Sequence, residues 1–305
     1  MERIGRYTPV VLLALLLAFA MLHYGAVLRD PNGVLLANKG DGLKNYYTFL
    51  WQVEHGERPL HFSGMNHPYG EHFLFTDGHP ALAWGIRALD HMFPFIGDHA
   101  IGLLNLCLIL GLVITGFVLY RLLRDLGVRP WTAAACALGI TVLAPQVDRL
   151  GGHLALSWSM CIPLTWWLVL RCHRSDRPLG WYVACAVNTL FWLFTHTYLG
   201  VMAAVFGGGL AVMSTVLERP RRTRAWTRAL WAVVAGCMFP LAAFTVLIRL
   251  TDTHSGRSEH PTGIFNYTAE PDDVLLPTAP PLRPLLDQWT NGAISTQWEA
   301  SAYVG

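Results

Sequence analysis

The stretch from Pro178 to Leu217, which contains no Asp, Glu, Lys or Arg, constrains the fold of this chain more than any other feature. A single helix of about 40 residues would be about 60 Å long, twice the thickness of the hydrocarbon core of a bilayer. We therefore predict two membrane-spanning helices joined by a tight hairpin near "FTHTYLG".

The composition of the whole chain agrees with a membrane protein. Of its 305 residues, 53% are hydrophobic and 14% are charged, and the mean hydropathy is +0.37. A soluble domain carries about 25% charged residues. We predict an all-α polytopic membrane bundle with about seven transmembrane helices, at residues 9–28, 100–122, 130–147, 154–170, 180–196, 198–217 and 227–249. The first is interpreted as an uncleaved anchor, since no small-x-small cleavage site follows it.

The placement of arginine predicts the orientation. One set of connections holds Arg3, Arg6, Arg121, Arg124, Arg129, Arg171, Arg174, Arg177 and the segment "ERPRRTRAWTR". In the two short connections on the other side, Arg149 is the only basic residue. The positive-inside rule puts the N-terminus in the cytoplasm and the segments 29–98 and 251–305 outside. We expect an integral protein of a bacterial inner or plasma membrane.

Two units follow from this topology: a transmembrane domain over 1–250 and an external loop or tail over 251–305. Apolar character resumes at "QWEASAYVG", so we expect a fragment whose tail leads into a missing helix; a complete chain with an external tail is the alternative. The six cysteines lie in or beside apolar runs and are interpreted as small core residues.

The long first external loop is predicted to contain two amphipathic helices in the membrane interface. The two apolar faces are formed by Leu43, Tyr46, Tyr47, Leu50 and Trp51, and by Leu82, Ile86, Leu89 and Phe93. Between them lies a histidine-rich segment that carries Glu71 and Asp77. Hydrogen-bonded or solvated histidines are the favoured interpretation; a divalent cation, Mg²⁺ or Mn²⁺, held by Asp41 with Asp77 or Glu71 is the alternative.

Asp41, in "NKGDGLKNYY", has two interpretations. An aspartate before Gly-Leu-Lys at the start of a helical pattern is a good N-cap, because its carboxylate accepts backbone N–H bonds. Its place on the external face, beside an aromatic helix, instead favours an active-site carboxylate.

Other polar residues are predicted on the same face. Arg149 either engages a phosphate or snorkels to lipid headgroups, and His153 begins the next helix. His196 lies in an uncharged stretch and is either a site residue or a wetted helix end. Glu299 is a further acidic residue of this face.

With these motifs in place, the chain resembles the GT-C superfamily of integral-membrane glycosyltransferases, which use polyprenyl-phosphate-linked sugars. The likeness rests on "GDGLKNYY", "NHPYGEHFLFTDGHP", "RLGGHLALSW", "THTYLG" and "WEASAYVG". It implies a catalytic Asp41, a lipid-phosphate site at Arg149 with His153, and inversion at the anomeric carbon.

We accordingly expect a hexosyl- or pentosyltransferase with Asp41 as general base and Arg149 as phosphate partner. His153, His196 and Glu299 are expected to bind substrate. The expected partners are the polyprenyl-phosphate-linked sugar and membrane lipid, and no nucleic acid is expected to bind. The alternatives are a transporter or flippase, for which Asn105, Asn188 and Gly207–Gly209 are the only hints, and a non-catalytic membrane protein.

Overall fold

The structure is a computed structural model that describes residues 7–56, 58–217, 223–253 and 283–290. The chain divides into two compact units, Met1–Asp252 and Thr253–Gly305. In the second unit the described residues form one helix, α15 (Arg283–Thr290). The first unit holds the bundle and the site discussed below.

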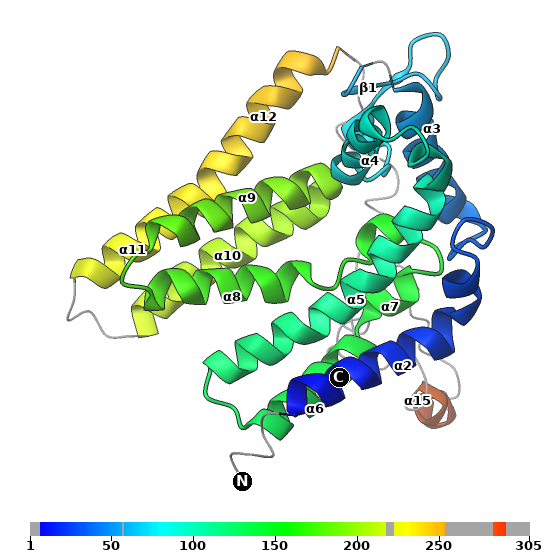
Figure 1. Ribbon diagram of the computed structural model, residues 1–305. Helices are drawn as coiled ribbons and strands as arrows, with labels where there is room; N and C mark the ends of the chain where they lie inside the picture. The colour runs from blue at the N-terminus through cyan, green and yellow to red at the C-terminus, as the bar shows by residue number, and fades with distance from the viewer. Residues whose placement is uncertain (1–6, 57, 218–222, 254–282, 291–305) are drawn as a thin grey trace. The chain divides into compact units, whose positions relative to one another are not determined.

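The first unit is an all-α polytopic membrane bundle, as the sequence predicts (Figure 1). Its long apolar helices are α2 (Thr8–Arg29), α5 (Ala100–Asp125), α6 (Pro130–Val142), α8 (Cys161–Arg174), α9 (Leu179–Thr195), α10 (Thr197–Leu217), α11 (Thr223–Val233) and α12 (Phe239–Thr251). Among the described residues, six helical segments are long and apolar enough to cross a membrane, and α9 is apolar but shorter. The helices α11 and α12 belong to one such segment, joined by the π-helical turn η4 (Val234–Met238).

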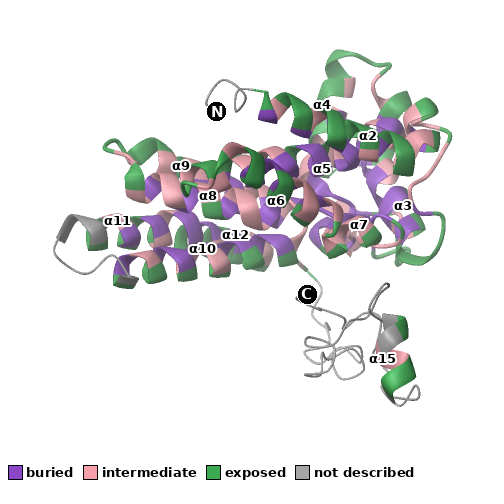
Figure 2. Cartoon of the chain, turned by 90° about the horizontal axis from the view of Figure 1, so that it is seen from below, coloured by how far each residue is buried: buried purple, intermediate pink, exposed green. Residues whose placement is uncertain are grey.

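The helices pack in two groups. The first contains α2, α5 and α6, the second contains α8 to α11, and α5 packs on α8 to join them. Buried residues lie where the helices face one another, and the outward faces are exposed (Figure 2). The outward faces are rich in Leu, Val and Met, for example Leu22, Val205 and Leu250, which suits contact with lipid rather than water.

The predicted hairpin is confirmed. His196 alone separates α9 from α10, and its extended backbone (φ −158°, ψ 127°) breaks the helix. Two other predicted spans correspond to apolar segments of similar extent, Pro130–Arg149 and Leu154–Arg174, but each segment is interrupted by a break in the helix. The helix expected over 130–147 ends at Val142 because Pro145 begins the short helix α7 (Pro145–Arg149). The helix expected over 154–170 begins only at Cys161, after the 3₁₀ turn η3 (Leu154–Leu156).

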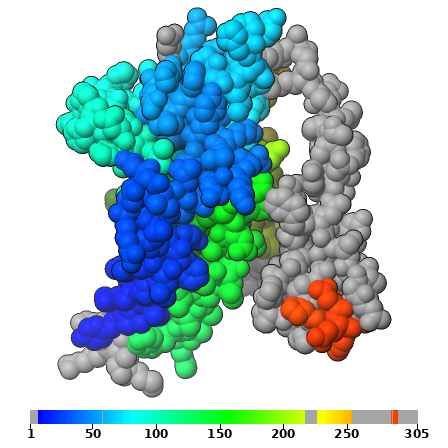
Figure 3. Space-filling model, turned by 90° about the vertical axis from the view of Figure 1, so that its right-hand side faces the viewer, coloured from blue at the N-terminus to red at the C-terminus, as the bar shows by residue number. Residues whose placement is uncertain are grey.

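The loop between α2 and α5 forms an ordered cap at one end of the bundle (Figures 1 and 3). It contains α3 (Gly40–His55), α4 (Pro80–Met92), the 3₁₀ turns η1 (Phe73–Phe75) and η2 (Gly97–His99), and an antiparallel pair of two-residue strands, β1 (His61–Phe62) and β2 (Glu71–His72). The two amphipathic helices are therefore present. The protein-facing side of α3 differs from the predicted apolar face, because Asn45, Phe49 and Gln52 are buried while Leu43 and Tyr47 are exposed.

Hydrogen bonds fix this cap on the bundle. Asn105, fully buried in α5, donates to the carbonyl oxygens of Pro31 (2.8 Å) and Val34 (2.9 Å). It also accepts a hydrogen bond from the hydroxyl of Tyr46 in α3, and that hydroxyl accepts one from the Leu36 backbone N–H. The polar residue expected at mid-span thus holds α3 against α5.

Candidate functional site

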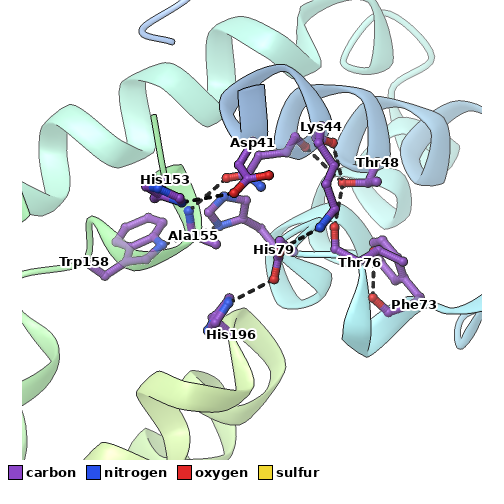
Figure 4. Close-up of polar contacts among 12 residues, drawn as sticks. Asp41, Lys44, Thr48, Phe73, Thr76, His79, His153, Ala155, Trp158 and His196 are labelled. Carbon is purple, nitrogen blue, oxygen red and sulfur yellow. Dashed lines mark hydrogen bonds and ion pairs between the residues drawn. The ribbon is translucent and has the colours of Figure 1, made fainter. Parts of the chain in front are cut away.

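The N-terminal turn of α3 presents Asp41 to a separate connection of the bundle. The helix begins at Gly40, its N-cap residue is Lys39, and Asp41 lies within the first turn. The interpretation of Asp41 as the N-cap is therefore wrong. Its carboxylate Oδ2 instead lies 3.3 Å from Nδ1 of His153, and the side chain is 54% exposed (Figure 4). The helix dipole favours a negative charge at this end of α3.

Residues one turn further along α3 hold the two segments together. Side chains at i and i+4 share a helix face, so Asn45 stands beside Asp41. The Asn45 Oδ1 accepts a hydrogen bond of 3.2 Å from the backbone N–H of Ala155. This bond anchors the 3₁₀ turn η3 next to α3 and so brings His153, which directly precedes η3, to the carboxylate of Asp41.

A second aspartate–histidine pair joins the cap to the α9–α10 hairpin. Asp77 accepts hydrogen bonds through both oxygens, from Lys44 Nζ (2.9 Å) and from His196 Nε2 (3.0 Å). Burial alone would raise the pKa of the Asp77 carboxyl, but the bonds from His196 and Lys44 and their positive charge lower the pKa below its usual value. Asp77 is therefore ionised at neutral pH and links three segments, α3, the "TDGHP" loop and the hairpin.

The backbone around Asp77 is strained. Asp77 (φ 58°) and His79 (φ 48°) both occupy the left-handed region, at about 1–2 kcal/mol each. Gly78 between them lies where an added Cβ would come within 2.6 Å of the Phe73 ring and 3.0 Å of the Thr48 hydroxyl. Strain of this kind persists where surrounding contacts fix the backbone, and it concentrates at functional sites.

His79 lies fully buried beneath this loop. The indole N–H of Trp158 donates to its Nδ1 at 3.4 Å, which leaves the proton of a neutral imidazole on Nε2. Burial and the neighbouring positive charge of His196 lower the pKa of His79 to about 3, against a smaller opposing effect of Asp77. His79 is therefore a neutral packing residue at pH 7.

The two pairs face one cavity of about 460 Å³, within the ~300–1,000 Å³ range of small-molecule sites. Its polar lining consists of Asp41, Asn45, Asp77, His153, His196 and Thr197. Its apolar lining consists of Leu74, Phe75, Ala155, Leu156 and Tyr198. Carboxylate, amide, imidazole and hydroxyl groups thus converge from α3, the cap loop, the α7–α8 connection and the hairpin.

Two other predicted site residues, Arg149 and Glu71, are not among the described residues that line the cavity. Arg149 is half-buried at the end of α7 and is not one of the described residues that line the cavity. Glu71 meets the side chain of Asn66 (3.2 Å) and is likewise absent from the described lining. The structure therefore does not bring Glu71 and Asp77 together, and no group of three or more His, Cys, Asp or Glu among the described residues is arranged to hold a metal ion. Glu299 lies outside the described residues.

Several residues of the site were missed in the sequence. Lys44 and Asn45 follow Asp41 by three and four positions, and this helical spacing was a signal that could have found them. Thr197 and the aromatic Phe75 carry no such signal, because only the meeting of the cap and the hairpin makes them neighbours of one cavity.

The residues that could have indicated a transport path have packing or hydrogen-bonding roles in the structure. Asn188 donates to the Thr165 hydroxyl (3.0 Å) and accepts from the Trp192 indole (2.9 Å). Gly207 lies where a Cβ would approach the Thr165 methyl group at 3.0 Å, so its lack of a side chain permits close packing of α10 on α8. Asn105 holds the cap, as described above.

The fold and this cavity define a polytopic helical membrane protein with a polar, histidine-lined cavity at one end of the bundle. Residues 11–305 match the family described as a domain of unknown function, DUF6311, and the chain belongs to that family. No curated protein and no solved structure matches the chain.

Proposed function

We propose that this protein is a membrane glycosyltransferase that moves a sugar from a polyprenyl-phosphate donor to an acceptor hydroxyl. The observation that carries the proposal is the half-exposed Asp41 carboxylate, which lies 3.3 Å from His153 and lines a cavity of about 460 Å³. A carboxylate that is accessible, oriented by a histidine and placed beside a substrate-sized cavity has the geometry of a general base.

The reaction balances as a single displacement. The Asp41 carboxylate takes the proton of the acceptor hydroxyl as the acceptor oxygen forms a bond to the anomeric carbon. The bond from that carbon to the phosphate oxygen breaks, and its electron pair leaves with the polyprenyl phosphate. Attack opposite to the leaving group inverts the anomeric configuration. His153 orients the carboxylate through its Nδ1.

The leaving phosphate needs positive charge near it. Arg149 precedes His153 by four residues, and its carbonyl oxygen accepts the His153 backbone N–H at 2.7 Å. This bond links Arg149 to His153, which lines the cavity. We therefore propose Arg149 as the phosphate partner, with a guanidinium that binds phosphate oxygens in pairs.

The proposal includes an orientation. The arginine bias supports a cytoplasmic N-terminus and an external cap, and we propose the plasma membrane of a bacterium as the location. A reporter that is active only outside the cytoplasm, fused at Gly64 of the cap, should be active. A signal there from a reporter restricted to the cytoplasm would contradict the orientation.

The activity is tested with the full-length gene product in lipid nanodiscs. Radiolabelled polyprenyl-phosphate sugars are supplied with a membrane extract as the source of acceptor, and transfer of label is measured. Asp98→Asn is the control for loss of a carboxylate outside the site. Asp98 is an exposed carboxylate of the same cap and is not among the described residues that line the cavity. Transfer by wild type and by Asp98→Asn is the expected result. Absence of transfer from every hexosyl and pentosyl donor would contradict the proposal.

A further inference from the structure

Two exposed aromatic side chains frame the hairpin end of the cavity. Phe75 is 38% exposed and Tyr198 is 68% exposed, and both line the cavity. Phe75 precedes Asp77 by two residues, and Tyr198 follows His196 by two. The hydrogen bond of 3.0 Å between Asp77 and His196 therefore brings the segments that carry the two rings together.

Both rings are braced by neighbouring histidines. The Tyr198 ring packs edge-on against His196, with a centroid distance of 5.1 Å, and the Phe75 ring lies 5.4 Å from that of His72. Each ring thus contacts a neighbouring histidine, and 68% of Tyr198 and 38% of Phe75 stays exposed. An aromatic face carries negative charge density, which attracts the partly positive C–H groups of a ligand.

The polar groups at the same end are of the kind that bind hydroxyl groups. Asp77 and His196 line the cavity there, and the hydroxyl of Thr197 stands next to His196. Within the described residues, the Thr197 hydroxyl oxygen and the His196 Nδ1 are buried and have no hydrogen-bond partner. Buried polar atoms of proteins are normally paired, so a ligand hydroxyl or a water molecule would complete their hydrogen bonding.

We propose that this end of the cavity, between Phe75, Tyr198 and the Asp77–His196 pair, is a saccharide subsite that binds a neutral sugar ring. The aromatic rings take the C–H face of the sugar, and the carboxylate, imidazole and hydroxyl groups take its hydroxyls. The inference deepens the proposed glycosyl transfer and rests on it for its biological role. The ring belongs to either the donor sugar or the acceptor, since both share this chemistry.

Direct binding tests the subsite without any need for turnover. The full chain is placed in nanodiscs of zwitterionic lipid, because glycoside detergents would compete for the site. The probes are methyl α- and β-D-glucopyranoside, galactopyranoside and mannopyranoside, observed by saturation-transfer NMR, with open-chain sorbitol as the negative probe. At least one pyranoside should bind, with saturation concentrated on its ring C–H protons.

Variants then locate the binding. Tyr198→Ala and Phe75→Ala should weaken it about three- to tenfold, the range expected for loss of one aromatic contact, and Tyr198→Phe should keep it. Tyr69→Ala is the matched control, because Tyr69 is a 78% exposed tyrosine of the cap that is not among the described lining residues. Equal binding by wild type and by both Ala variants would overturn the proposal and leave Tyr198 as an interfacial anchor.

The transfer assay separates the two sources of the ring. A raised KM for the acceptor alone in Tyr198→Ala places the acceptor ring in the subsite, and a raised KM for the donor alone places the donor sugar there. Unchanged values for both overturn the subsite. Pyranoside binding by a protein that transfers no sugar from any donor would count against the proposed function and leave the subsite standing.

Discussion

At one end of the cavity Asp41 is 54% exposed and meets His153 at 3.3 Å; at the other end Asp77 is 33% exposed and accepts bonds from both Lys44 and His196. The first carboxylate stands on a regular helix, whereas the second stands on strained backbone. Both are aspartate–histidine pairs facing the same space. Their difference indicates that Asp41 is available to take a proton and that Asp77 holds the cap to the hairpin.

Removal of His153, the histidine that contacts Asp41, should lower the rate of sugar transfer more than removal of any other residue that supports Asp41. His153→Asn keeps a polar side chain but loses the imidazole that orients Asp41. Displacement of a catalytic group by about 1 Å can cost about 100-fold in rate, so loss of the His153 contact should lower transfer by about ten- to hundredfold. The rate at saturating donor should fall while the yield of membrane-inserted protein stays at the wild-type level. An unchanged rate would remove His153 from the orientation of the base.

Disruption of the contacts that Asp77 makes with Lys44 and His196 should lower the stability of the folded protein. Asp77→Asn replaces one acceptor oxygen by an N–H₂ donor that faces Lys44 or His196. A polar group left without its partner costs about 1–3 kcal/mol, so thermal unfolding in detergent should begin several degrees lower. Asp98→Asn serves again as the exposed control. If Asp77→Asn and wild type have the same melting temperature, the contacts of Asp77 with Lys44 and His196 do not hold the cap.

Protonation of buried His79 sets a pH dependence of stability. Its pKa is lowered in the folded protein to about 3, against about 6.5 in an unfolded chain. The unfolded state therefore binds more protons below pH 6.5, and stability falls as the pH falls from 7 towards 3. Between pH 7 and 5.5 the expected loss is about 1 kcal/mol.

The contribution of His79 is isolated by comparison with a variant that does not titrate. His79→Gln should melt lower at pH 7 but should lose less melting temperature than wild type between pH 7 and 5.5. Parallel loss in both proteins would show that other groups cause the acid sensitivity.

Arg149 should show the smallest effect, because it is not among the described residues that line the cavity. Arg149→Lys keeps the charge but loses the paired hydrogen bonds of the guanidinium. We expect a severalfold rise of KM for the donor with little change in KM for the acceptor. An unchanged donor dependence in Arg149→Ala would exclude Arg149 from phosphate binding.

The sequence was sufficient for the bundle and for part of the site. The uncharged run from Pro178 to Leu217 predicted the hairpin at His196, and the helical spacing of apolar residues predicted the two cap helices. The interruptions at Pro145 and at η3 were not predictable, because hydropathy reports which segments suit the membrane and not where the helix is broken within such a segment. Asp41 was found, but its pairing with His153 depends on the Asn45–Ala155 bond between α3 and η3. The same limit applies to the pairing of Asp77 with His196, whose positions lie 119 residues apart in the chain.

The comparison of Asp41→Asn with Asp77→Asn in one preparation tests the division of roles most directly. The single-turnover rate of sugar transfer at saturating donor and the melting temperature are measured for both variants. Asp41→Asn removes the basicity but retains the shape of the side chain, so the rate should fall by at least about 100-fold, given that positioned acid–base catalysis is worth about 10²–10⁴-fold, with an unchanged melting temperature. Asp77→Asn should lower the melting temperature and retain a much larger share of the rate. The opposite pattern, with near-full transfer by Asp41→Asn and loss of transfer by a stable Asp77→Asn, would contradict the assignment of Asp41 as the base.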